Sequence, residues 1–163
     1  MRVTHGVAEA IDRTAALALL LKGALTEVPR DTLLDPAYAP VRAAAPGWAP
    51  AVTEIAGGGT YRAEGWGVTI IGGANVVHSI EAALWAAATA DTYRDAILAA
   101  INLVNDTDMT AAIAGALVGA LWGEEAIPTP WLDALKWRNH IEGMGEELRA
   151  AAQDRAPAGA RAG

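Results

Sequence analysis

The chain has 163 residues, of which 53% are hydrophobic and 19% charged, and it contains no cysteine. This composition excludes a disordered chain, a disulfide-stapled scaffold and a thiolate metal site. The formal net charge of −7 and the pI of about 4.8 argue against binding of nucleic acid through a basic surface. Alanine dominates the apolar residues, which predicts closely packed helices.

No targeting or membrane-spanning segment is predicted. The leucine-rich stretch at residues 15–21 follows acidic residues, which is the wrong order for a secretory signal. The apolar run at residues 109–123 is shorter than the roughly 20 residues that a bilayer crossing needs. We therefore expect a soluble, cytoplasmic protein with neither nucleic acid nor a membrane among its partners.

The first predicted helix covers residues 7–25, and Pro29 and Asp31 are expected to end it. Its apolar positions recur at helical spacing, at Val7, Ile11, Ala15, Ala18 and Leu19. Residues 35–73 are rich in proline and glycine, which predicts a long irregular loop region with a short helix near residues 50–55.

Helical patterns dominate the chain from residue 79 onward. Ser79 is the expected N-cap of the first of these helices, Thr92 and Asp95 form a capping box for the second, and Gly123 ends the third. The predicted helices cover residues 79–89, 93–103, 109–122, 129–137 and 140–152, and residues 154–163 are expected to be a disordered tail.

The predicted helix at residues 109–122 is apolar nearly all round, which indicates a buried central element. Three tryptophans, Trp122, Trp131 and Trp137, are expected to fill gaps in the core. The charged residues of the last helix are expected to form a solvated face: Glu142, Glu146, Glu147 and Arg149.

Two carboxylates mark the start of the 109–122 helix. Asp106 and Asp108 would point to different sides of a regular helix, so they converge on one ion only where the backbone is not yet helical. A loop-to-helix junction meets that condition, and hard divalent cations prefer several oxygen ligands. The same residues also fit a local role, with Asp106 or Thr107 as the N-cap and Asp108 favoured by the helix dipole. The sequence leaves both interpretations open.

A glycine-rich turn precedes the predicted 79–89 helix. Gly72, Gly73 and Asn75 could bring backbone amides close to an anion, although glycine pairs before helices are common. The histidines each lie near a predicted helix start, where polar residues are typically structural, and no two have metal-ligand spacing on one helix: His5, His78 and His140.

Several segments resemble the ADP-ribosylglycohydrolase family. The Asp-x-Asp pair belongs to the run DTDMTAAIAGAL at residues 106–117, which follows VVHSIEAALWA at 76–86 and YRDAILAAINL at 93–103. The similarity continues through WGEEAIP at 122–128, and the opening RVTH at 2–5 is similar to the Thr-His segment that precedes a long helix in the family.

The resemblance implies an all-α fold, a compact orthogonal helical bundle over residues 1–153 that resembles the second half of the family's fold. It implies Mg²⁺ or Mn²⁺ ions and hydrolysis of the glycosidic bond between ADP-ribose and an acceptor. By position, the resemblance assigns Asp106 and Asp108 as metal ligands. Thr110 is the candidate third ligand, with Thr107 as its alternative, although neither is in register with the family's threonine. It places His5 near the substrate, and a loop that contacts ADP-ribose at Gly72, Gly73 and Asn75.

The sequence also departs from the family's pattern. Met109 stands where the family has a threonine ligand, Val104-Asn105 replaces a Gly-Gly pair, and Ala74-Asn75 replaces Gly-Tyr. The resemblance covers only the second half of the family, without the Thr-Asp-Asp run of the first half. We therefore expect low metal occupancy, and a complementing chain or a second copy that covers the exposed apolar surface.

Two functional hypotheses follow from the resemblance. The first is a hydrolase that is incomplete on its own and acts on an ADP-ribosylated protein or a small ADP-ribose conjugate. The second is an inactive remnant, or an ADP-ribose-binding or interaction protein on the same scaffold. A third alternative, an unrelated alanine-rich helical protein, would not need an Asp-x-Asp helix start beside a glycine-rich loop.

Overall fold

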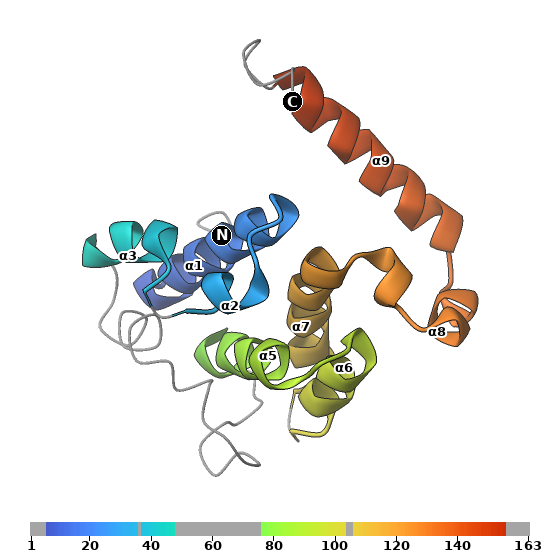
Figure 1. Ribbon diagram of the computed structural model, residues 1–163, viewed down its shortest axis with the longest axis horizontal. Coiled ribbons are helices and arrows are strands. Elements are labelled where there is room, and N and C mark those ends of the chain that lie inside the picture. Colours follow the sequence, from blue (N-terminus) through green and yellow to red (C-terminus); the bar gives the residue numbers. More distant parts are fainter. Residues whose placement is uncertain (1–5, 36, 48–75, 104–105, 156–163) are drawn as a thin grey trace. The chain divides into compact units, whose positions relative to one another are not determined.

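The computed structural model describes residues 6–35, 37–47, 76–103 and 106–155 (Figure 1). Every regular element in these ranges is a helix, which confirms the predicted all-α fold. The chain divides into two compact units, residues 1–127 and residues 128–163. None of the described helices combines the length and the apolar character needed to cross a bilayer.

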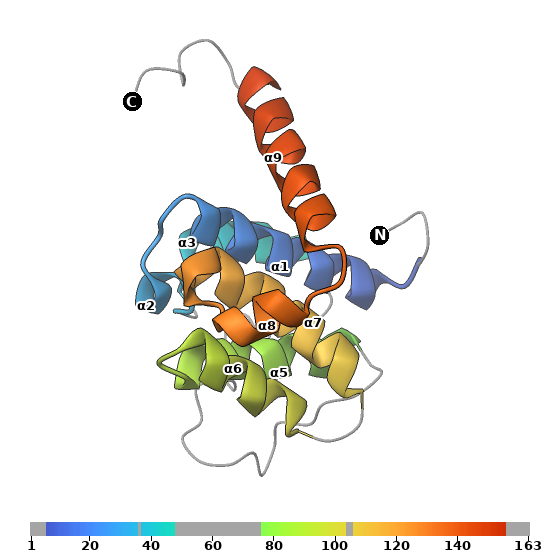
Figure 2. The same ribbon diagram turned by 90° about the vertical axis from the view of Figure 1, so that its right-hand side faces the viewer.

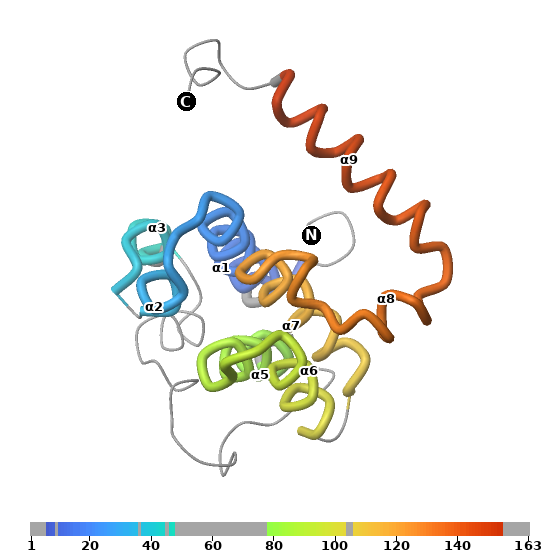
Figure 3. Tube along the Cα trace, turned by 45° about the vertical axis from the view of Figure 1, so that its right-hand side comes forward, coloured from blue at the N-terminus to red at the C-terminus, as the bar shows by residue number. Residues whose placement is uncertain are grey.

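The first unit is organised around α7, which packs against α1, α5 and α6 (Figures 1 and 2). Two short helices, α2 and α3, and the 3-10 turn η1 complete its N-terminal part, and both short helices contact α1 (Figure 3). The elements of this unit are α1 (Ala8–Leu25), α2 (Arg30–Leu33), α3 (Ala39–Ala44), η1 (Ala45–Gly47), α5 (Val76–Thr89), α6 (Tyr93–Ile101), α7 (Thr107–Trp122) and η3 (Glu124–Ala126).

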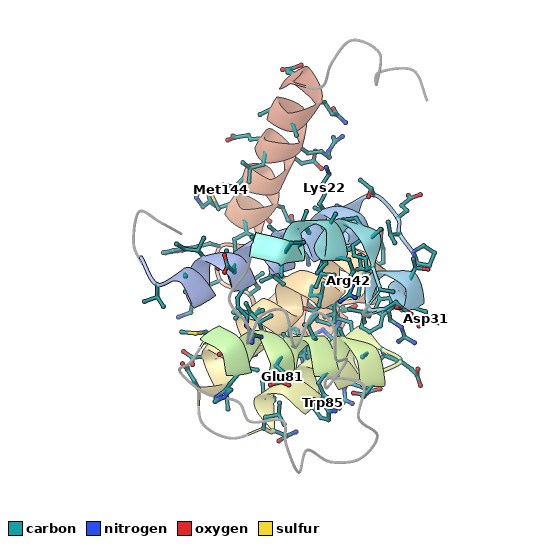
Figure 4. All side chains as sticks on the ribbon, turned by 90° about the vertical axis from the view of Figure 1, so that its left-hand side faces the viewer. Lys22, Asp31, Arg42, Glu81, Trp85 and Met144 are labelled. Carbon is teal, nitrogen blue, oxygen red and sulfur yellow. The ribbon has the colours of Figure 1, made fainter. Side chains whose placement is uncertain are left out.

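The helix α5 is the most completely buried element of the unit. Residues 82–87 are all at most 5% exposed, and five of these six side chains are alanine or leucine. Alanines let the neighbouring helices approach closely, and Trp85, labelled in Figure 4, supplies bulk within this run. The predicted N-cap is wrong, because α5 begins at Val76 and places Ser79 inside the helix, fully buried.

The prediction that α7 is buried all round holds for only part of its surface. Ala114, Leu117 and Val118 are fully buried against the neighbouring helices. Met109, however, is 46% exposed, and Ala112 and Ala116 on the same side are also exposed. An alanine-rich helix is apolar in every direction, so its sequence does not reveal which side remains uncovered.

In α1, the apolar residues that recur at helical spacing are not all buried. Val7 is 64% exposed and Ala18 is exposed, whereas Ala10, Leu20 and Ala24 are buried. The helix ends in a Schellman motif, because the amide of Val28 donates to the Gly23 carbonyl at 3.0 Å and that of Glu27 donates to the Ala24 carbonyl at 3.0 Å. Glu27 has a φ of 61°, the left-handed conformation that this motif requires.

Two further expectations for the N-terminal part are corrected. Pro29 and Asp31 do not simply end the first helix, because Pro29 is the N-cap of α2 and Asp31 lies in its first turn. The predicted loop region at 35–73 contains α3 and η1 in its described part. Its remainder, including the short helix expected near 50–55, lies outside the described residues.

One arginine, at the start of α2, contacts the C-terminal ends of two other helices. The Arg30 Nη1 donates to the Ala90 carbonyl at 2.6 Å, just after the end of α5. Its guanidinium lies 5.9 Å from the centre of the Trp122 ring at the end of α7. A cation near two helix C-termini is favourable, and stacking on an indole adds to this. Trp122 is half-buried, so its predicted packing role is met in part.

The predicted helix boundaries around α6 and α7 are mostly confirmed. The Thr92 side chain accepts a hydrogen bond from the Asp95 amide at 3.1 Å, and its hydroxyl donates to the Asp95 carboxylate at 2.8 Å, so Thr92 is the N-cap of α6 as predicted. Gly123 follows α7 with a φ of 79°, a conformation that favours glycine.

The second unit contains α8 (Thr129–Ala134) and α9 (Arg138–Arg155). The helix predicted at 129–137 therefore ends early, and the first two residues of the predicted tail belong to α9 instead; residues 156–163 lie outside the described residues. Trp131 and Trp137 are 37% and 81% exposed, so their assignment to the core is wrong. The solvated charged face is confirmed, with ion pairs between Arg138 and Glu142 and between Arg149 and Glu146.

Candidate functional site

The carboxylate pair lies where the chain enters α7. Asp106 is the N-cap, with a φ of −73° and a ψ of 71°, and Asp108 is the second helical residue. The two side chains form a hydrogen bond with each other. The non-helical backbone at Asp106 allows this convergence, which a continuous helix would prevent because residues two apart point to different sides.

The hydrogen bond shifts the two carboxyl groups in opposite directions. The pKa of Asp106 is raised, first by the hydrogen bond with Asp108, then by partial loss of water and by the negative charge of Asp108. The pKa of Asp108 is lowered, first by the hydrogen bond with Asp106 and then by the nearby amides of Met109 and Asp108. The two carboxyl groups therefore titrate as a coupled pair whose pKa values are pushed apart.

The local capping interpretation is supported only for the backbone. The side chain of Asp106 makes no capping hydrogen bond of normal geometry, although its position is that of the N-cap. Thr107 is the first helical residue and not the cap. The Met109 amide lowers the pKa of both carboxyl groups through a hydrogen bond, so the carboxylates contact the helix start as well as each other.

Thr110 does not join the carboxylate pair through its hydroxyl. The hydroxyl donates to the Asp106 carbonyl at 2.9 Å, and the residue is fully buried. Met109 presents an exposed thioether beside the pair, 46% accessible, and such a soft group is a poor ligand for a hard ion. Thr107, which is half-buried, is the nearest hydroxyl-bearing residue in sequence to both carboxylates.

A divalent cation fits this arrangement in chemistry but not in ligand number. Carboxylate oxygens are the donors that Mg²⁺ and Mn²⁺ prefer, and the pair is open to solvent. Within the described ranges, no group of three His, Cys, Asp or Glu side chains could hold a metal ion. The positive end of α7 also opposes a cation. These residues can contribute two ligands, with water or other groups completing the shell.

The remaining predicted site residues lie outside the described part of the chain, namely His5, Gly72, Gly73 and Asn75. A surface cavity of about 500 Å³ opens beside the start of α1, and its described lining residues are Gly6, Ala8, Ile11, Asp12 and Gly47. Its volume falls in the usual range of ligand pockets. The residue before Gly6 is His5, so the cavity is next in sequence to one predicted substrate contact.

The helical patterning missed one buried charged residue. Arg13 is 1% exposed and lies on the buried face of α1, among the apolar residues of that face. Burying a guanidinium is expensive unless polar groups compensate it, so such a residue usually has a specific role. No sequence signal identifies it, because Asp12 and Arg13 together resemble an ordinary solvated pair.

Comparison with known proteins identifies the family of this chain. The profile of the ADP-ribosylglycohydrolase family matches residues 1–158. The chain belongs to the ADP-ribosylglycohydrolase family. It is 37% identical over 155 residues to the ADP-ribosylarginine hydrolase Tri1 of Pseudomonas putida, a match that covers 95% of this chain and 38% of that protein.

Other relatives agree with this assignment. The chain is 34% identical over 62 residues to the ADP-ribosyl-[dinitrogen reductase] glycohydrolase of Rhodospirillum rubrum, which covers 38% of this chain and 21% of that protein. A solved structure titled ADP-ribosylglycohydrolase-related protein complex superposes with a TM-score of 0.76 and 36% identity, covering 87% of this chain and 47% of that chain. The chain thus spans less than half the length of these relatives.

Proposed function

We propose that this chain carries part of a metal-dependent hydrolase that removes ADP-ribose from arginine side chains. The observation that carries the proposal is the convergence of Asp106 and Asp108 at the start of α7, in a chain of this family. The acceptor is proposed from the Pseudomonas relative, which is named an ADP-ribosylarginine hydrolase. An ADP-ribosylated protein would be the partner. The cytoplasm, a reducing compartment whose proteins rarely depend on disulfides, is the proposed location.

In this proposal, Asp106 and Asp108 hold a Mg²⁺ or Mn²⁺ ion at low occupancy. The bound ion would supply a Lewis acid that orients ribose hydroxyls and an attacking water. Holding it requires both carboxylates to be ionised, and the raised pKa of Asp106 makes this harder as the pH falls. The cavity beside Gly6, with His5 as its neighbour in sequence, is the proposed place for part of the ADP-ribose.

The isolated chain is expected to turn over slowly or not at all. Two carboxylates give fewer ligands than a hard cation needs, and each lost ligand weakens binding. A complementing chain or a second copy would have to supply the rest. The exposed Met109 beside the pair favours a second candidate function, an ADP-ribose-binding protein that no longer catalyses hydrolysis.

Metal binding tests the assignment of the carboxylate pair. Titration of the full chain with Mn²⁺, followed by electron paramagnetic resonance, should show weak binding that Asp106→Asn together with Asp108→Asn abolishes. The matched control is Glu124→Gln with Glu125→Gln, which removes the same charge from exposed residues after the other end of α7. Equal loss of Mn²⁺ binding in both double variants would overturn the assignment.

Binding and turnover of ADP-ribose separate the two candidate functions. Isothermal titration with ADP-ribose should show binding that Mg²⁺ strengthens, and an arginine-ADP-ribosylated peptide should release ADP-ribose slowly. Binding without any release above that of the double aspartate variant would favour the second candidate. Absence of both binding and release, in a chain whose circular dichroism is helical, would refute both.

A further inference from the structure

Thr110 is a polar residue at a position of α7 that packing alone would fill with an apolar one. The buried side of the helix continues from it through Ala114, Leu117 and Val118, and all of these side chains are fully buried. Their sequence spacing places them on one face of the helix. A hydroxyl in such surroundings weakens the fold unless it is hydrogen-bonded, so its partner indicates what it does.

The partner of this hydroxyl is the backbone of the first aspartate of the pair. The Thr110 hydroxyl donates to the Asp106 carbonyl at 2.9 Å, and the Thr110 amide donates to the same oxygen at 3.2 Å. A carbonyl oxygen has two lone pairs, so one residue can occupy both. The amide bond is as long as such bonds usually become, whereas the hydroxyl bond lies within its usual range. The hydroxyl therefore contributes much of the hold on this carbonyl.

The start of α6 shows how a helix begins without this second bond. Its N-cap, Thr92, has a side-chain cap, and the corresponding bond from the Ala96 amide to the Thr92 carbonyl is 3.0 Å long. At the start of α7 the Asp106 side chain makes no cap of normal geometry, and its ψ of 71° departs from the extended conformation usual for an N-cap. The hydroxyl of Thr110 thus holds the end of α7 that lacks a regular cap.

The orientation of the Asp106 carbonyl limits where the Asp106 side chain can point. The angle ψ is the rotation about the bond that joins this carbonyl to the Cα atom carrying the side chain. With the carbonyl held to α7 by two hydrogen bonds, a ψ of 71° directs the carboxylate toward Asp108. We infer that Thr110 is a positioning residue, whose hydroxyl holds the Asp106 carbonyl so that the two carboxylates converge. The inference rests on the proposed function only where it connects this convergence to binding of a divalent cation.

Other threonines make the same kind of bond and provide a matched control. Within the described ranges, the hydroxyls of Thr14, Thr26 and Thr89 each donate to the carbonyl four residues earlier, at 2.8, 3.0 and 2.8 Å. These three acceptors lie inside helices, whereas Asp106 lies just outside α7. Thr14 is half-buried in α1, so Thr14→Val removes an equivalent bond that holds no residue of the carboxylate pair.

Nuclear magnetic resonance tests the hold on Asp106 without any metal, because the Cα and Cβ chemical shifts of a residue report its backbone angles. Valine has nearly the shape of threonine without the hydroxyl, so we expect Thr110→Val to fold and to move the shifts of Asp106. Thr110→Ser keeps the hydroxyl and should leave them close to the wild-type values, and Thr14→Val should leave them unchanged. Unmoved Asp106 shifts in Thr110→Val would overturn the inference, whatever the chain does with metal.

A Mn²⁺ titration tests whether the hold matters to the carboxylate pair. Bound Mn²⁺ broadens the amide signals near it, so weak binding at residues 106–109 can be followed directly. We expect Thr110→Val to weaken this binding about tenfold, the lower end of the range for residues that orient metal ligands. Thr110→Ser should bind Mn²⁺ like the wild type. Thr14→Val should also do so, even where urea unfolds it more readily.

The two measurements together separate this inference from its alternatives. Weaker Mn²⁺ binding with unmoved Asp106 shifts would make Thr110 a ligand itself and overturn the positioning role. Moved shifts with unchanged Mn²⁺ affinity would show that the hydroxyl does not keep the carboxylates together, which also overturns it. A wild-type chain without Mn²⁺ broadening at residues 106–109 would refute the proposed metal site, and the Asp106 shifts alone would then decide the inference.

Discussion

The substitution Gly23→Ala is a sharp test of the packing between α1 and the two short helices. Gly23 is buried, and a Cβ at this position would overlap the Leu33 side chain and lie 2.5 Å from the Tyr38 hydroxyl. Leu33 is 1% exposed and has no solvent to move into. Tyr38 is half-buried, and it would have to shift away from α1.

Two opposing effects set the size of the change. Alanine is favoured over glycine inside a helix by about 0.8–1.0 kcal/mol. Overpacking a well-filled core costs about 1–3 kcal/mol. Because two atoms overlap and one of them belongs to a fully buried side chain, we expect the steric cost to exceed the helix gain. The predicted net effect is a loss of about 1–2 kcal/mol in the free energy of unfolding.

Gly119→Ala provides the matched control within the same unit. The nearest atom to a Cβ at Gly119 is in the Tyr93 ring, 3.9 Å away, so the methyl group fits without strain. The same chemical change should then stabilise the chain by up to about 1 kcal/mol. Urea unfolding followed by circular dichroism would measure both variants, and thermal midpoints should move in opposite directions by about 2–4 °C per kcal/mol. If Gly23→Ala is as stable as Gly119→Ala, the inferred contact is absent.

Three further substitutions test other local interactions of the first unit. Arg30→Lys should lower the free energy of unfolding, measured by urea titration, by about 1–2 kcal/mol, because lysine cannot both reach the Ala90 carbonyl and stack on Trp122. An unchanged stability would show that these two contacts of Arg30 do not stabilise the chain. Thr92→Ala should cost about 0.5–2 kcal/mol through loss of the N-cap of α6, whereas Thr92→Ser should restore most of it; equal losses would show that the hydroxyl is not the cause. Glu27→Gly should raise the thermal midpoint and increase the free energy of unfolding by about 0.5–1 kcal/mol, because a non-glycine residue in the left-handed conformation costs about 1–2 kcal/mol. The control Glu27→Ala should not increase the stability.

The sequence predicted helices well, but it did not show which of their faces are buried. Caps and stops depend on one or two residues with specific backbone chemistry, and the Thr92 cap and the Gly123 stop are therefore found as expected. Which face is buried depends on contrast between apolar and polar positions. That contrast is missing in α1 and α7, where alanine occupies many positions on all sides.

The tryptophans show a different limit of sequence reasoning. Trp85 is 5% exposed in α5, whereas Trp137 is 81% exposed just before α9. Composition alone favours burial for both, because the indole is large and mostly apolar. The two tryptophans differ in how many helices surround them, which is a property of the tertiary structure. The same reason explains why Arg13 escaped notice, since its burial comes from neighbours and not from its own chemistry.

The carboxylate pair shows what sequence can predict about a site when a geometric condition is stated. Convergence of residues two apart requires one of them to lie outside the helix. The expected start at residue 109 would leave both aspartates outside, whereas α7 begins at Thr107 and leaves only Asp106 outside, with a ψ of 71°. One non-helical residue is sufficient, because it swings the Asp106 side chain toward that of the helical Asp108. The backbone at a single residue thus decides whether the two carboxylates converge, and substitutions that extend α7 through residue 106 should separate them.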